Sequence, residues 1–205
     1  LVSKNGLHLF VIQKFNIRWY PPEKQILIPN YDLDGRLIGI RVRETEEENI
    51  DAFGKYHPAT ISNITYRFST ALYLYGIYQN QEAIRKTRRV FVFEGEKSVL
   101  AAGSYLKDNS SVALLGSSVS VYQVEMLLGL GVSEIILCLD RQYHKWGDPD
   151  CIKWKNKLFD ISQKYKAYTK FSIVLDDKNR LGYKDSPTDK GKDIFLELVK
   201  ERKVL

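Results

Sequence analysis

Acidic residues follow the apolar segments in the carboxyl-terminal half of this chain at three points. Glu94 comes directly after the apolar run "VFVF", and Asp140 comes after "EIILCL", two residues before Gln142. A third acidic stretch, "DSPTD", covers residues 185–189 and follows a further apolar segment. Carboxylates that gather without partners repel one another, and a hard divalent cation relieves that repulsion. The pattern therefore predicts a site for Mg²⁺ or Mn²⁺.

Gly95 stands directly after Glu94, where a strand is expected to pass into a helix. We expect the glycine to let the backbone turn at once, so that Glu94 points into a cleft with no side chain in front of it. In the alternative interpretation, Glu94 is a solvated acid in an ordinary strand-to-helix turn, and the three acidic features are unrelated.

The segments that would position these acids alternate between short apolar runs and helical patterns. The predicted strands cover residues 90–94, 111–116, 134–140 and 171–176, and the predicted helices cover 97–106, 122–130, 149–165 and 190–202. Nearly continuous apolar strands between helices are typical of an α/β fold, in which helices cover both faces of a parallel sheet. Ligands bind such sheets at the carboxyl ends of the strands, where Glu94 and Asp140 are expected.

The first 87 residues have a different pattern. Residues 25–43 predict a β-hairpin around a turn at Asp34, the acidic run 46–49 predicts a solvated loop, and residues 69–86 have helical spacing. We therefore predict a smaller α+β subdomain at 1–87 and a catalytic α/β domain at 88–205.

Composition favours a polyanionic partner in a reducing compartment. The 205 residues are 44% hydrophobic and carry a formal net charge of +6, a basic balance that suits nucleic acid. The two cysteines have no zinc-binding spacing, and no apolar run reaches membrane length, so we expect a cytoplasmic protein. Because the chain begins at Leu1 instead of Met, we also expect it to be a fragment.

Basic residues gather before the first strand of the larger domain. Arg85, Arg88 and Arg89 lead toward that strand, which makes them candidates for phosphate contacts. In the lysine-rich helix 149–165, we interpret Trp154 as a packing residue and the lysines as a solvated face; in the alternative interpretation, Trp146 and Trp154 stack on unpaired bases among the lysines.

The ordered motifs resemble the Toprim signature: a strand followed by Glu-Gly, a glycine turn after the second strand ("LLGSS", with Gly116), and a strand followed by Asp-x-Asp. The preceding segments "ILIPNYDLDGRLIGIRVR", "GKYHPAT" and "LYGIYQNQEAIRK" resemble the part that precedes the Toprim module in DnaG-type primases. The resemblance extends from Asn16 to Val199 and points to the phage or mobile-element branch of this family.

The resemblance implies a DNA primase catalytic core, which acts in DNA replication. Such a core joins ribonucleoside triphosphates into short RNA primers on a single-stranded DNA template, by nucleotidyl transfer that depends on Mg²⁺ or Mn²⁺. A replicative helicase would bind through regions outside this chain, and no membrane is involved.

The resemblance also implies roles for individual residues. Glu94 and Asp140 are the expected catalytic residues, and Gly95 and Gly116 the expected turn residues. The implied metal ligands are Glu94, Asp140, Gln142, Asp185 and Asp189. The implied template-binding residues are Arg41, Arg43 and Lys55.

The chain departs from the family pattern at several positions. Gln142 replaces the second aspartate, Ser98 stands where many members have an acid, and the late acidic motif has an unusual spacing. Fewer acids leave fewer metal ligands, so the number of metals stays open. Two other functions also remain: a non-catalytic module that binds nucleic acid or nucleotides, and a Toprim nuclease that uses the same acids to cut DNA.

Overall fold

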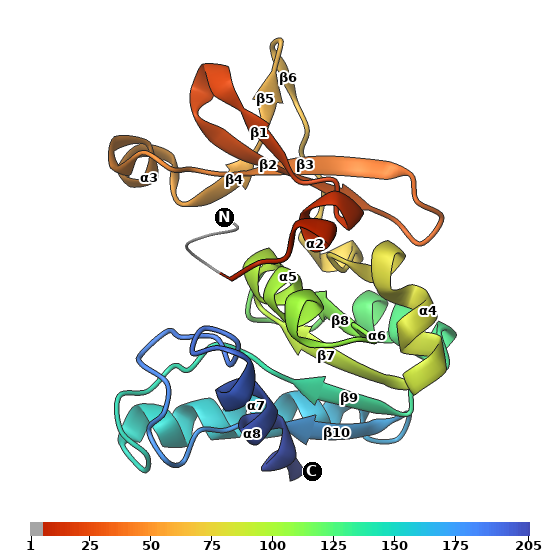
Figure 1. The fold of residues 1–205 in the computed structure, drawn as a ribbon. Coiled ribbons are helices and arrows are strands. Elements are labelled where there is room, and N and C mark those ends of the chain that lie inside the picture. Colours follow the sequence, from red (N-terminus) through yellow and green to blue (C-terminus); the bar gives the residue numbers. More distant parts are fainter. Residues whose placement is uncertain (1–5) are drawn as a thin grey trace.

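The computed structural model describes residues 6–205, which form two main sheets joined by helices (Figure 1). The larger sheet contains β7 (Arg89–Phe93), β8 (Ser111–Ala113), β9 (Glu134–Leu137), β10 (Lys170–Ile173) and β11 (Lys203–Val204). Its strand order is β11-β10-β9-β7-β8. The first four of these strands along the chain run parallel, and β11 adds an antiparallel edge. The predicted α/β class is therefore confirmed.

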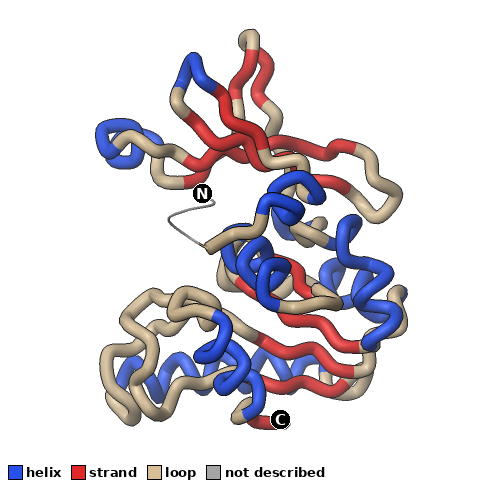
Figure 2. Tube along the Cα trace, in the orientation of Figure 1, coloured by secondary structure: helices blue, strands red, loops and turns tan. Residues whose placement is uncertain are grey.

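Helices cover both faces of the larger sheet because alternate residues of its strands point to opposite sides. Val90 and Val92 belong to a core with α4 (Ile77–Thr87), α6 (Val121–Gly129) and α7 (Pro149–Tyr165). Phe91 and Phe93 belong to a second core with α2 (Leu9–Lys14), α5 (Glu96–Tyr105) and α8 (Lys192–Lys200). Figure 2 shows these helices around the strands. Burial on both sides explains why the strands are apolar almost throughout.

The smaller sheet is antiparallel, with the order β1-β2-β3-β4. Its strands are β1 (Arg18–Tyr20), β2 (Gln25–Tyr31), β3 (Leu37–Arg43) and β4 (Tyr56–Pro58), and a separate hairpin joins β5 (Thr60–Ile61) to β6 (Ile64–Thr65). The β2–β3 pairing is the predicted hairpin, with a register shift at Asn30 and Tyr31.

The two sheets do not have separate cores. Ile28 of the smaller sheet shares a buried cluster with Phe93 of the larger one. The helices α2 and α4 precede Thr87, yet both pack against the larger sheet. A division near Thr87 thus separates the sheets along the chain but leaves their packing continuous.

Four local predictions differ from the structure. The expected loop at 46–49 forms the start of α3 (Glu47–Phe53), since Glu47 and Glu48 lie in a first helical turn, which favours acids. The expected helix at 69–86 begins only at Ile77, because Gly76 has φ 83° and a short 3₁₀ turn (Thr70–Leu72) precedes it. The closing helix ends at Lys200, and β11 follows. The larger sheet's parallel strands end earlier than predicted, at Phe93, Ala113, Leu137 and Ile173.

A 3₁₀ turn, η1 (Pro21–Glu23), completes the elements between residues 6 and 205. Within this range no helix combines the length and the apolar character that crossing a bilayer requires.

Candidate functional site

Glu94 and Asp140 lie at the same edge of the larger sheet, on neighbouring strands. Val92 of β7 is paired with Leu137 of β9, and the Cys138 amide donates a 2.8 Å hydrogen bond to the Val92 carbonyl. Glu94 follows β7 directly, and Asp140 lies three residues beyond β9. The two carboxylates are half-buried, and strand ends that are themselves fully buried hold them in place.

Neither carboxylate forms an ion pair with a residue of the range 6–205: the lysines that act on Glu94 and Asp140 are Lys157, which is hydrogen-bonded to Ser117, and Lys97, which is paired with Asp189. Burial raises the pKa of Asp140 to about 7, and the charges of Glu94, Asp189 and Asp185 add to the shift. Burial also raises the pKa of Glu94, although the Asp140 backbone amide and Lys157 act in the opposite direction. The Oε1 atom of Glu94 is buried and has no hydrogen-bond partner among residues 6–205. A buried carboxylate oxygen without a hydrogen-bond partner, close to a second acid, favours the binding of a cation.

The charges of Asp185 and Asp189 also raise the pKa of Asp140, but each of these two acids is paired with a lysine. Asp185 is 2.9 Å from Lys190 and accepts a 2.6 Å bond from the Gly182 amide. Although burial acts in the opposite direction, these contacts lower the pKa of Asp185. Asp189 accepts bonds of 3.0 Å from Lys97 and from the Ser186 amide. The two loop acids are therefore neutralised by lysines.

Buried side chains fasten the loop of Asp185 and Asp189 to the strand ends. The Arg141 amide donates to the Asp185 carbonyl at 2.9 Å, and its buried guanidinium is 3.3 Å from Asp176. Ser98 donates a 2.8 Å hydrogen bond to Ser186. Ser98, which stands where many relatives of the Toprim type were expected to have an acid, thus has an anchoring role here.

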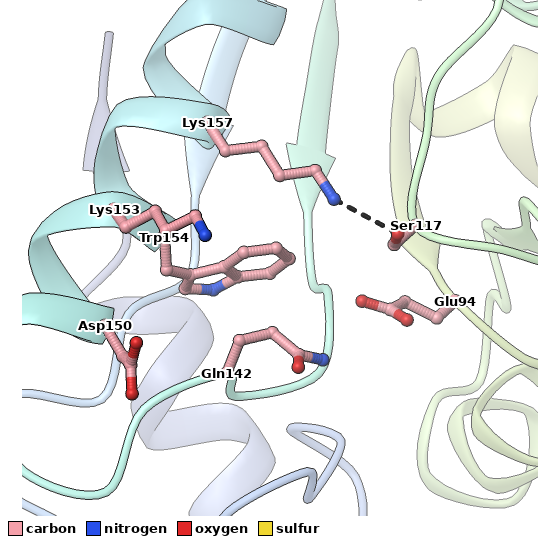
Figure 3. A pocket seen from close by; sticks show the side chains of 7 residues that line it. All are labelled: Glu94, Ser117, Gln142, Asp150, Lys153, Trp154 and Lys157. Atoms are coloured by element: carbon pink, nitrogen blue, oxygen red, sulfur yellow. Dashed lines mark hydrogen bonds between the residues drawn. The ribbon is translucent and has the colours of Figure 1, made fainter.

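A pocket of about 350 Å³ opens beside Glu94. Figure 3 shows the Glu94 carboxylate and the Gln142 amide pointing toward each other across it, with α7 forming the opposite wall. Lys157 of α7 donates a 3.1 Å hydrogen bond to Ser117. The complete lining consists of Glu94, Ser117, Gln142, Asp150, Lys153, Trp154 and Lys157.

The sequence alone did not identify the α7 side of this pocket. Lys153 and Lys157 were assigned to a solvated face and Trp154 to packing. Trp154 is indeed buried in the core, but all three also line the pocket. Their i, i+4 spacing was the available signal, because it places the two lysines on one side of the helix.

Glycine at positions 95 and 116 is not required by backbone conformation. Gly95 has φ −126° and serves as the N-cap of α5, a conformation open to any residue. In the turn after β8, the positive φ (61°) belongs to Leu115. Apart from the adjacent residues in the chain, a Cβ atom at either glycine would meet no described atom within 4 Å. What both glycines provide is open space at the carboxyl edge.

Two of the three expected template-binding residues, Arg43 and Lys55, lie near Lys97, which is paired with Asp189. Lys55 has a pKa lowered by burial and by the charges of Arg43 and Lys97. Arg43 and Lys97 also line one small hollow. Arg41, in contrast, forms a 2.8 Å ion pair with the buried Glu96 of α5, and so joins the two sheets.

The cluster of Arg85, Arg88 and Arg89, predicted to contact phosphates, lies at the amino end of β7, away from the acids. Arg89 begins β7 and Glu94 follows its last residue, which puts the two ends roughly 15 Å apart at about 3.3 Å per residue. Arg88 donates to the Gly131 carbonyl. These arginines mark the amino edge of the sheet.

The residues at the carboxyl edge partly fit a divalent cation. The orphaned Glu94 oxygen and the raised pKa of Asp140 favour one. Among residues 6–205, however, no group of three or more His, Cys, Asp or Glu side chains is arranged to hold a metal alone. Mg²⁺ is commonly bound by one or two carboxylates together with substrate phosphates. Glu94 and Asp140 fit that mode.

A search of family models finds no match to the chain. The chain is 33% identical, over 207 residues, to an uncharacterised protein named YorJ of Bacillus subtilis, derived from the SPbeta prophage. The match covers 96% of this chain and 55% of the prophage protein, so the chain spans about half the length of that relative.

Solved structures with the same fold are primase catalytic cores. A DnaG primase catalytic domain bound to single-stranded DNA matches with a TM-score of 0.73 and 20% identity, over 99% of this chain and 70% of the other. The zinc-binding and RNA polymerase domains of the Aquifex aeolicus primase match with a TM-score of 0.74 and 19% identity, over 100% of this chain and 55% of the other. The resemblance in the sequence is confirmed at the level of structure: the chain has the fold of the DnaG primase catalytic core.

Proposed function

We propose that this chain is the catalytic core of a DNA primase, which joins ribonucleotides into RNA primers on single-stranded DNA. One observation carries the proposal: in a primase-core fold, two half-buried carboxylates at the ends of adjacent strands form no ion pair with residues 6–205, and burial raises the pKa of one of them, Asp140, to about 7. Structural acids are normally paired, so such a pair suggests a cation site that serves chemistry.

Glu94 and Asp140 would hold the divalent cation, Mg²⁺ or Mn²⁺. When bound, the cation stabilises the negative charge that develops on the transferred phosphoryl group. The strands β7 and β9 fix the two carboxylates, so little reorganisation is needed at the moment of reaction. Gln142 offers a neutral amide oxygen as a further ligand, and Asp185 and Asp189 become available when their lysines are displaced.

The template would approach from the side of the smaller sheet. Arg43 and Lys55 lie within electrostatic range of Lys97, which is paired with Asp189 at the acidic edge. Cations along such a groove attract the phosphates of single-stranded DNA. Arg41 contributes indirectly, because its ion pair with Glu96 holds β3 against α5.

The test is primer synthesis on a single-stranded DNA template with ribonucleoside triphosphates and Mn²⁺ or Mg²⁺. We expect metal-dependent RNA products from the parent and from Glu125→Gln, which makes the same chemical change on an exposed site of α6. Glu94→Gln should abolish them. Metal-dependent cutting of the DNA instead of RNA synthesis would support the nuclease alternative.

A non-catalytic binding module is the second candidate, and Gln142 favours it. An amide in place of a carboxylate weakens metal binding, and the described residues contain no ready-made cage of three acids. Binding of single-stranded DNA without any primer synthesis, at any divalent metal tested, would select this function.

The biological setting is also a proposal. The prophage origin of the relative suggests that the chain serves the replication of a phage or another mobile element. A replicative helicase would then be contacted by parts of the protein outside this chain.

A further inference from the structure

Lys157 is held at the mouth of the Glu94 pocket. Its ammonium group donates to the Ser117 hydroxyl at 3.1 Å and lies 4.9 Å from the centre of the Trp154 ring. It also acts on Glu94, because its charge opposes the rise in that residue's pKa. A lysine restrained by a hydroxyl and an aromatic face has already given up much of its rotamer freedom, so it binds an anion at a smaller entropic cost.

The pocket combines this cation with a second one and with two neutral hydrogen-bonding groups. Lys153 lies one helical turn before Lys157 and lines the same cavity, as do the Ser117 hydroxyl and the Gln142 amide. Figure 3 shows Lys153 on the α7 side and Glu94 on the opposite side, with the Lys157 side chain reaching from α7 across to Ser117. Two lysines from α7 near the Glu94 carboxylate match a ligand with negative charge and a bound divalent cation, and Asp150 of α7 adds a second carboxylate to the lining.

The substitution at Gln142 alters the charge balance of this pocket. An aspartate there would add a negative charge opposite the lysines, whereas the amide adds none. The pocket thus has fewer acids to attract metal and two lysines that attract phosphate directly. Protein cations here can take over part of the charge neutralisation that additional acid-bound metal would otherwise supply.

We propose that this pocket binds the polyphosphate group of the incoming nucleoside triphosphate, with Lys157 and Lys153 as phosphate contacts. The inference rests on the proposed function, since it names the ligand of the same site. A pocket of about 350 Å³ suits a compact polyphosphate. An extended DNA strand would instead require a long groove lined by cations.

The experiment measures binding of inorganic tripolyphosphate, with and without Mg²⁺, by titration calorimetry on the whole chain. We expect saturable binding by the parent and an affinity about tenfold or more weaker in Lys157→Met, the change expected when one charge-assisted phosphate contact is removed. Lys157→Arg keeps the charge and should retain most of the affinity.

Lys155→Met is the matched control. Lys155 lies on the same helix and carries the same charge, but its ammonium group is 4.9 Å from the centre of the Trp146 ring, and it does not line the pocket. Its removal should leave tripolyphosphate affinity unchanged. Thermal melts without ligand would establish that both variants are folded.

Three results would overturn the inference. They are no tripolyphosphate binding by the parent, an equal decrease in Lys157→Met and Lys155→Met, and a Lys157→Met defect confined to single-stranded DNA. Failure of the proposed function gives another pattern: tripolyphosphate binding that depends on Lys157 in a protein that makes no primers.

Discussion

The acids at the two ends of strands β7 and β9 have opposite environments. At the amino end, Glu134 accepts hydrogen bonds from Ser172 at 2.6 Å and from Arg202 at 2.9 Å, and Arg89 is 3.4 Å away. Although burial acts in the opposite direction, the hydrogen bonds from Arg202 and Ser172 and the charges of Arg202 and Lys170 lower the pKa of Glu134. At the carboxyl end, burial raises the pKa of Asp140 to about 7, and the neighbouring Glu94 adds to that shift. The acid at the amino end has hydrogen-bond partners and supports the fold, whereas the two acids at the carboxyl end lack ion pairs and are the candidates for catalysis.

The largest expected effect is on catalysis at the carboxyl end. Asp140→Asn preserves shape and removes a charge that would hold the divalent cation, so primer synthesis should fall by about 10²–10³-fold. Single-turnover rates with saturating nucleotide would measure this. Asp160→Asn, an exposed change on α7, is the control. If the rate of primer synthesis falls by less than about threefold in Asp140→Asn, Asp140 is not a catalytic residue.

At the amino end the expected effect is on folding. Glu134→Ala removes the acceptor of the Ser172 and Arg202 hydrogen bonds, so the free energy of unfolding should fall by about 2–3 kcal/mol. Denaturant titration would measure the change. The activity of the molecules that remain folded should match the parent. If Glu134→Ala instead lowers activity without lowering stability, the division between the two ends is wrong.

The two ends should also give opposite pH dependences in metal-free protein. The folded pKa of Asp140 exceeds its ordinary value of 3.8, so its stabilising contribution is complete below that value and is lost as pH rises through about 7. Glu134 has a lowered pKa, so its contribution is present above its ordinary value of 4.5 and is lost as pH falls through its folded pKa.

Variants would show which residue causes each part of the dependence of stability on pH. Thermal melts from pH 3 to pH 8 should show that Asp140→Asn flattens the decline between about pH 4 and 7. Glu134→Gln should flatten only the acid limb. A decline between pH 4 and 7 that persists in Asp140→Asn would mean that other groups cause it.

The smallest expected effect concerns the template. Arg43→Glu with Lys55→Glu should weaken single-stranded DNA binding and reduce the slope of log K against log salt by about 0.7 for each phosphate that the protein no longer neutralises. Arg85→Glu, at the end of α4 near the amino edge, should leave the slope unchanged. If only Arg85→Glu changes the salt dependence of DNA binding, the template binds at the amino edge of the sheet instead.

The fold and the position of the acidic edge were predictable because both follow from local patterns. Apolar strands alternating with helices specify a parallel sheet, and the residue after a strand lies at its carboxyl edge. The same logic excludes Arg89 from the site, since it starts the strand that Glu94 follows.

Other features depend on contacts between distant segments. The pairing of Arg41 with Glu96 spans 55 residues, and the hydrogen bond between Lys157 and Ser117 spans 40. Local spacing places Lys153 and Lys157 on one side of their helix, but it does not tell whether that side faces solvent or a pocket. The roles of Arg41 and Lys157 therefore became visible only in the structure.

The most direct test of the cation site is thermal unfolding with and without Mn²⁺, for the parent, Glu94→Gln and Glu134→Gln. Metal at about 100 times its dissociation constant should stabilise the parent by about 2.7 kcal/mol. Glu134→Gln should gain as much as the parent, even from a lower starting stability. Glu94→Gln should be at least as stable as the parent without metal, because it repels Asp140 less, and should gain clearly less with it. Equal stabilisation of Glu94→Gln and the parent would contradict a cation site at the carboxyl edge.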